Sequence, residues 1–261
     1  MKFYDLGIKS SLSRGEHQPE VMLDSAIELG YSGVALADFD NGTPDVIKQL
    51  QKEYSPKCNI FTRATIIPKS ADAMKMRLKK LQNAVDIIAV RSGSDEKNIY
   101  VNAILDKRVD IISLSELSEF NCLDYSHFKM AKENGVLIEI STRDLILKER
   151  FQRSKLIRLM YKACEQIVRA NAPFIITSGA ESKWELRAPK ELIALAGLVK
   201  IPEKQAICAL STYPEMLIQK IKMMQDPNCI MAGVRIVPSD EEEHVGETKD
   251  KRKPEGDLDG C

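Results

Sequence analysis

Short apolar runs alternate with amphipathic segments along most of the chain. The apolar runs are rich in β-branched residues, and several open with Gly, Pro or Asp, as is typical of buried parallel strands. They predict strands over residues 2–8, 33–38, 59–67, 85–91, 109–114, 135–141, 173–178 and 230–237.

Between these runs, apolar residues recur at the spacing of one helix face. Residues 19–29 end at Gly30, a helix-stop signal, and residues 44–54 begin with Pro, which suits a first helical turn. Further helices are predicted over residues 71–82, 96–107, 124–134, 149–170, 189–199, 202–209 and 213–225. Eight strands with interleaved helices predict an α/β fold, a (β/α) TIM-like barrel. An open doubly wound sheet is the alternative.

The composition changes at Ser239. The segment 239–261 is acidic, dotted with Gly and almost free of large apolar residues. We therefore expect a single barrel domain over 1–238 and a disordered acidic tail over 239–261. The tail holds nine acidic and four basic residues, so its net charge of −5 leaves the barrel at +5 in a chain that is neutral as a whole. A mildly basic body can contact a polyanion but does not require one.

The sequence shows no features of a membrane or secreted protein. No apolar run approaches the roughly 18 residues of a transmembrane helix, and residues 2–8 read as a strand rather than as part of a signal peptide. None of the six cysteines forms a Cys-x-x-Cys pair. We expect reduced thiols, a cytoplasmic location and no membrane partner.

Candidate metal ligands are few and scattered. The chain has three histidines, and no His-x-His follows the first predicted strand, which runs Asp5-Leu6-Gly7. A hydrolytic site with two or three metals is hard to build without such ligands. We therefore expect no catalytic residue, no metal and no cofactor bound by this chain.

Four arginines lie in or just after predicted strands or their loops. A guanidinium in such a place needs an anion or a carboxylate partner. At Arg63, inside a strand, an internal ion pair and contact with a ligand are equally supported. At Arg91, Arg143 and Arg187, contact with phosphate or a protein partner is at least as well supported as an internal ion pair. The internal alternative would use carboxylates such as Asp5, Asp38, Glu139 or Glu181, and for Arg187 also Glu185.

The helix predicted over 149–170 has an apolar face and a basic stripe on the opposite side, which includes Lys155, Arg158 and Lys162. Such stripes are usually only solvated faces, but one sign of charge over five turns favours a polyanion. No known RNA-binding module is present, and aromatic residues make up only 6%. Any bound RNA should therefore be contacted through its backbone and shape rather than by base stacking.

The most specific motif joins the strand at 173–178 to the helix at 189–199. It reads Ser178-Gly179-Ala180 and then Leu186-Arg187-Ala188-Pro189. It resembles the thirty-kilodalton protein subunit of ribonuclease P, called protein component 3 in archaea. The similarity runs over about 1–238 and includes, in order, Asp5-Leu6, residues 62–67, 86–90 and 110–113, and Gly233-Val234.

The resemblance implies a barrel like those of the polymerase-and-histidinol-phosphatase superfamily, without their metal site. It implies an enzyme only as part of a ribonucleoprotein endoribonuclease that removes the 5′ leader of precursor tRNA. The RNA subunit does the chemistry with Mg²⁺, and this chain is not catalytic alone. The implied partners are ribonuclease P RNA, precursor tRNA within the complex and other ribonuclease P protein subunits. Ser178 joins the arginines and the stripe residues as a candidate contact with RNA or a partner.

Two other functions stay open from the residues alone. A free-standing barrel phosphoesterase is disfavoured by the shortage of histidines. A purely structural scaffold is disfavoured by the arginines near the barrel rim and by the basic stripe.

Overall fold

The computed structural model describes residues 1–37, 44–93, 97–225, 229–231 and 234–235. The chain divides into two compact units, Met1–Lys222 and Met223–Cys261. The predicted tail over 239–261 lies outside the described residues, as does Asp38.

Seven parallel strands form one sheet in which every strand pairs with its neighbours in chain order. This order is that of a (β/α) barrel and differs from that of a doubly wound sheet, where the order reverses at a switch point. The strands are β1 (Tyr4–Ile8), β2 (Gly33–Leu36), β3 (Asn59–Ile66), β4 (Ile87–Val90), β5 (Ile111–Leu114), β6 (Leu137–Ser141) and β7 (Phe174–Thr177).

The barrel is nearly closed, because its first and last strands approach each other. The Lys9 amide donates to the Ala180 carbonyl at 2.9 Å, just beyond the ends of β1 and β7. Within the described residues no strand ladder joins β1 to β7. The seam is instead closed by this bond and by the Asp5 side chain of β1, which accepts from the Ser178 amide at 3.1 Å.

The prediction of an eighth barrel strand over 230–237 is wrong. Two short segments there, β8 (Cys229–Met231) and β9 (Val234–Arg235), pair with each other in antiparallel fashion as a separate sheet. Their backbone groups therefore bond locally instead of extending the parallel sheet. Both segments belong to the second compact unit.

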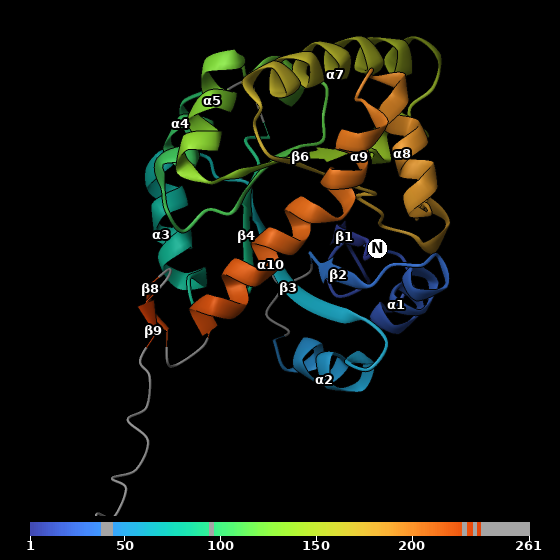
Figure 1. Ribbon diagram of the computed structural model, residues 1–261, viewed down its shortest axis with the longest axis vertical. Helices are drawn as coiled ribbons and strands as arrows, with labels where there is room; N and C mark the ends of the chain where they lie inside the picture. Colours follow the sequence, from blue (N-terminus) through green and yellow to red (C-terminus); the bar gives the residue numbers. More distant parts are fainter. Residues whose placement is uncertain (38–43, 94–96, 226–228, 232–233, 236–261) are drawn as a thin grey trace, which may run out of the picture. The chain divides into compact units, whose positions relative to one another are not determined.

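The long helices lie where the periodicity predicts them, with ends that shift by one or two residues. Figure 1 shows most of them on the outside of the strands. They are α1 (Pro19–Glu28), α2 (Pro44–Tyr54), α3 (Ala71–Leu81), α4 (Lys97–Leu105), α5 (Tyr125–Asn134), α7 (Arg150–Ala170), α8 (Pro189–Leu198), α9 (Glu203–Leu210) and α10 (Thr212–Gln225). Three short elements were not predicted: α6 (Arg143–Leu147) and the 3-10 turns η2 (Glu119–Asn121) and η3 (Lys183–Glu185).

The strand residues alternate between two apolar layers. In β4, Ile88 and Val90 belong to the layer under the outer helices, whereas Ile87 and Ala89 belong to the layer inside the barrel. Three buried residues of α10 complete the inner layer: Leu217, Ile218 and Ile221.

Helix α10 covers the amino-terminal end of the barrel (Figure 1). On the same helix, Lys220 Nζ lies 3.0 Å from Asp110 Oδ1, one residue before β5 begins. Because α10 covers this end, the opposite end, at the carboxyl ends of the strands, is left to form the mouth.

Candidate functional site

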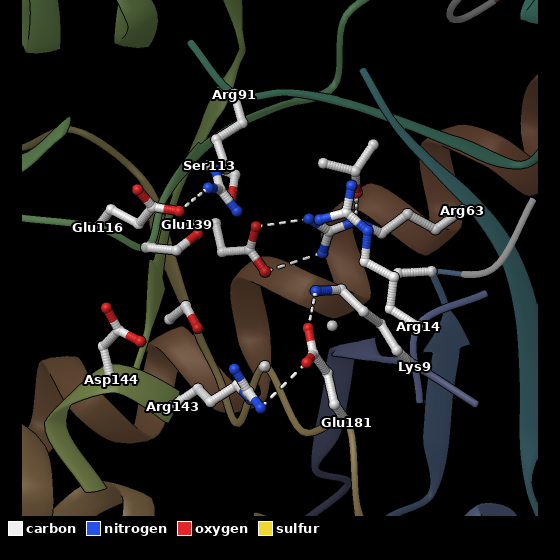
Figure 2. Close-up of a pocket in the computed structure, with 16 residues that line it drawn as sticks. Lys9, Arg14, Arg63, Arg91, Ser113, Glu116, Glu139, Arg143, Asp144 and Glu181 are labelled. Atoms are coloured by element: carbon white, nitrogen blue, oxygen red, sulfur yellow. Dashed lines mark hydrogen bonds and ion pairs between the residues drawn. The ribbon is translucent and has the colours of Figure 1, made fainter. Parts of the chain in front are cut away.

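A pocket of about 270 Å³ opens at the carboxyl ends of the strands. In barrels of this kind, functional groups gather at this face. Figure 2 shows charged side chains from strands and from the loops after them converging on it. Its lining includes four acidic side chains and five basic ones, Lys9, Arg14, Arg63, Arg91 and Arg143.

The centre of the pocket is an ion pair across the barrel interior. Arg63 of β3 donates from Nη1 and Nη2 to the two oxygens of Glu139 of β6, at 2.8 and 2.6 Å. Both side chains are only 3% exposed. Arg63 also donates to the Leu6 carbonyl, and the Thr177 hydroxyl donates to Glu139 at 2.8 Å. Arg63 therefore has the internal partner that the sequence left open.

Burial opposes ionisation of Glu139, but the charge and hydrogen bonds of Arg63 outweigh it. The pKa of Glu139 is held below its ordinary value. Gly7 of β1 lies against this carboxylate, and a Cβ there would stand 2.9 Å from Glu139 Oε1. The Asp5-Leu6-Gly7 motif thus has a packing reason for its glycine.

Asp5 and Ser178 form the second buried group. The Asp5 carboxylate is fully buried and accepts from the amides of Gly7 and Ser178, both at 3.1 Å. Ser178 is also fully buried, and its hydroxyl accepts from the Ala180 amide at 3.2 Å. Burial raises the pKa of Asp5 to about 6. Asp5 is therefore bonded to backbone amides instead of an arginine. The Ser178 hydroxyl stabilises the loop after β7 through its hydrogen bond with the Ala180 amide.

Arg143 and Lys9 hold that loop from outside. Lys9 Nζ lies 2.7 Å from Glu181, and Arg143 Nη2 lies 3.0 Å from the other oxygen of the same carboxylate. Arg143 Nε also lies 2.7 Å from Glu185. Burial opposes ionisation of Glu185, yet the Arg143 hydrogen bond keeps the pKa of Glu185 below its usual range. Gly179 has φ +65 and packs so closely on the Ser141 hydroxyl that a Cβ would collide with it.

Arg91 is held by a carboxylate that the sequence did not reveal. Glu119 in η2 is fully buried, and its Oε1 accepts from Arg91 Nε at 2.8 Å. Its other oxygen accepts from the amides of Ser115 and Glu116 at 2.8 and 2.9 Å. Arg91 also pairs with the Glu116 side chain. A single 3-10 turn has no hydrophobic periodicity, so nothing in the pattern marked Glu119.

Arg187 is placed differently from the other arginines. Its Nη1 donates to the carbonyls of Trp184 and Leu186, at 2.8 and 2.7 Å. It is half-buried and does not bond to Glu181 or Glu185, which hold Lys9 and Arg143. Arg187 therefore closes its own loop and stays partly accessible.

The basic stripe lies on the solvent side of α7, whose opposite face is buried in the core. Lys155, Arg158 and Lys162 are all exposed. In the part of the chain that the structure describes, none of the three forms an ion pair or a side-chain hydrogen bond. Of the predicted contact residues, these three are exposed, Arg91, Arg143 and Arg187 are half-buried, and Arg63 and Ser178 are buried.

The donor set at the mouth does not fit a metal. Glu139 and Glu181 already accept from guanidinium or ammonium groups. The described residues contain no group of three or more His, Cys, Asp or Glu side chains arranged to hold an ion. His127 instead accepts from the Asp124 amide at 3.3 Å, at the start of α5, and His244 lies outside the described residues.

None of the described helices is long and apolar enough to span a bilayer.

The family model for RNase P subunit p30 matches residues 2–226. The chain belongs to this family. Ribonuclease P protein component 3 of Methanosarcina acetivorans is 26% identical over 240 residues, which are 92% of this chain and 98% of that protein. The protein of the same name from Methanococcoides burtonii is 28% identical over 234 residues, 90% of this chain and 93% of that one.

The fold is also similar to solved structures. A chain in the cryo-EM structure of archaeal ribonuclease P with mature tRNA has a TM-score of 0.75 at 18% identity, and the match covers 92% of this chain and 100% of that one. A Xaa-Pro dipeptidase has a TM-score of 0.56 at 12% identity, covering 85% of this chain and 76% of that one. At these identities both similarities show the fold alone.

Proposed function

We propose that this chain is an RNA- and protein-binding subunit of ribonuclease P that supports removal of the 5′ leader of precursor tRNA. Its family membership over residues 2–226 is the observation that carries the proposal. The partners would be the ribonuclease P RNA, precursor tRNA in the complex and other protein subunits. The archaeal ribonuclease P chain that matches this fold supports that assignment.

We assign the chemistry of the complex to its RNA, with the Mg²⁺ bound there, and none of it to this chain. The carboxylates at the barrel mouth support this division, because arginine and lysine side chains neutralise them. A carboxylate held in this way is a poor general base and a poor metal ligand. Cleavage of precursor tRNA by the purified chain without RNA would contradict the assignment.

The RNA contact is assigned to the stripe of Lys155, Arg158 and Lys162, which are exposed and have no described carboxylate partner. Their ammonium and guanidinium groups are free to replace counterions on a phosphate backbone. Arg187, on the loop before α8, is the second candidate contact, with RNA or with another subunit.

The test is reconstitution of precursor-tRNA cleavage with and without this chain, followed by binding of its RNA partner over a range of salt concentrations. Changing the three stripe residues to Gln should lower affinity most at low salt. It should also flatten the log–log salt slope by about one unit for each lost phosphate contact.

The matched control changes three exposed lysines of α3, Lys75, Lys79 and Lys80, to Gln, which removes the same charge elsewhere. It should leave the slope closer to that of the wild type. Equal effects of the two triple variants would show that only overall charge matters. The stripe would then not be the contact.

A further inference from the structure

Arg14 is the one basic residue of the mouth pocket that lacks a partner among the described residues. It lies between β1 and α1, and Figure 2 shows its side chain reaching toward the pocket centre, where Arg63 also lies. Arg14 makes no hydrogen bond and no ion pair with the part of the chain that the structure describes. The other basic side chains hold carboxylates, in the pairs Lys9–Glu181, Arg63–Glu139, Arg91–Glu119 and Arg143–Glu185.

Arg14 is an exposed residue, but the backbone next to it is held by hydrogen bonds within the chain. The Gly15 amide donates to the Ser10 carbonyl at 2.8 Å, and the Glu16 amide donates to the Glu181 carbonyl at 2.7 Å. A Cβ at Gly15 would stand 2.7 Å from the backbone of Ser10, so only glycine allows this tight turn. The turn therefore holds the backbone that carries Arg14 beside the pocket.

Glu139 neutralises Arg63, so the exposed guanidinium of Arg14 is the basic group of the pocket that remains available to an anion. Further donors are close to the same space. Arg143 uses Nε and Nη2 for its carboxylates, and its Nη1 has no hydrogen-bond partner among the described residues. Hydroxyls of Ser115 and Ser141 also line the pocket.

The lining also limits what the anion can be. Glu116 and Asp144 at the pocket are already paired with Arg91 and Lys148, so the site offers one unpaired positive charge and does not suit a ligand with many negative charges. One uncompensated cation, forked donors and hydroxyls suit a single tetrahedral oxyanion. We propose that the barrel mouth binds one phosphate group through Arg14, either as free phosphate or as the terminal phosphate of a nucleotide or RNA end. The inference goes beyond the proposed function and does not depend on it.

The test is calorimetric titration of the full chain with inorganic phosphate, in a low-salt buffer free of other oxyanions. Wild type should bind saturably, and Arg14→Gln should bind at least about tenfold more weakly, as expected for loss of a charge-assisted contact. Arg77→Gln removes an exposed arginine of α3 outside the pocket lining and should bind like the wild type. Arg14→Gln should keep the wild-type melting temperature, because no described contact is lost.

A flat titration up to millimolar phosphate, or equal affinity in wild type and Arg14→Gln, would overturn the proposal. The source of the phosphate is decided by competition. Two short oligoribonucleotides of the same sequence are compared, one with a 5′-phosphate and one with a 5′-hydroxyl. If only the first displaces inorganic phosphate, the ligand is a terminal phosphate. Failure of both oligonucleotides, with inorganic phosphate still bound, identifies the free ion. Equal displacement by both would show general backbone binding and would overturn a site for one phosphate group.

These outcomes are separate from those of the proposed function. Phosphate binding is measured on the isolated chain, whereas the ribonuclease P role is measured by reconstituted cleavage. Either can fail while the other succeeds.

Discussion

At the scale of single residues, the mouth of this barrel contains charged pairs where many enzymes of the same architecture place a reactive centre. The Arg63–Glu139 pair spans the interior, and both members are almost fully buried. Bidentate geometry and the added Thr177 hydrogen bond satisfy the carboxylate. Such a pair adds little net stability compared with apolar residues of the same shape, but removing one partner leaves an uncompensated charge.

Glu139→Ala should therefore lower the free energy of unfolding by about 3–5 kcal/mol. The double variant Arg63→Met with Glu139→Leu should recover much of that loss, because no charge is then left unpaired. Urea denaturation measures both. Glu116→Gln, at a side chain that is 51% exposed, is the control and should change little. A single variant as stable as the control would show that the buried pair is not under this constraint.

Asp5 should give the protein a specific pH dependence. Its pKa is raised from 3.8 to about 6 in the folded state, so the folded chain binds the proton more tightly than the unfolded chain does. The stabilisation by this proton is complete below about pH 4 and is lost as pH rises toward 6, on the order of 3 kcal/mol in total. Asp5→Asn should remove this dependence. Parallel stability curves for wild type and variant between pH 4 and 6 would contradict it.

At the scale of elements, α10 has the most unusual task, because it fills the amino-terminal end of the barrel instead of covering the outside. Its Leu217, Ile218 and Ile221 are at most 6% exposed and complete the inner core. Ile218→Ala should cost about 2–5 kcal/mol of stability, since it opens a cavity that the strands cannot fill. Met216→Ala, on the same helix but 60% exposed, should melt close to the wild type. Similar losses of stability in both variants would mean that helix propensity, and not the packing of α10 into the barrel interior, determines the effect.

The elements themselves could mostly be predicted, and the reasons differ from case to case. Buried strands and long amphipathic helices carry their burial pattern in the sequence, so β1 to β7 and the long helices were found. The short turns α6 and η2 offer too few residues for a period to show. The run at 230–237 is apolar and β-branched like the true strands, and only the pairing of β8 with β9 distinguishes it.

The site was predictable in part for a related reason. Arginines in or beside buried strands were recognised because each must be neutralised. The carboxylates that neutralise Arg91 and Arg143 could not be recognised, because Glu119 and Glu185 lie in short turns that only the fold brings close to these arginines. Lys9 and Arg14 were missed altogether. Lys9 follows β1 directly, as Arg91 follows β4, so the same argument could have found it, whereas Arg14 sits in a loop without a pattern.

At the scale of the whole molecule, charge is divided unequally along a neutral chain. The segment 239–261 carries a net −5 and lies outside the described residues. Because it holds almost no large apolar side chains and would repel RNA, its deletion should leave the melting temperature and reconstituted ribonuclease P activity nearly unchanged. Thermal melting and cleavage of precursor tRNA by the truncated chain measure this. A marked fall in either would assign the segment a role in the fold or in the assembly.

The seam between β1 and β7 has a consequence for how the barrel moves. Six strand pairs are joined by backbone ladders, whereas β1 and β7 are held by the Asp5 carboxylate and by the bond from Lys9 to Ala180. A structure opens first where the fewest backbone hydrogen bonds must break together. Amide protons of β1 and β7 should therefore exchange with deuterium sooner than those of β3 to β6. They should do so increasingly as pH rises from about 4 to 6, the range over which the stabilisation by the Asp5 proton is lost.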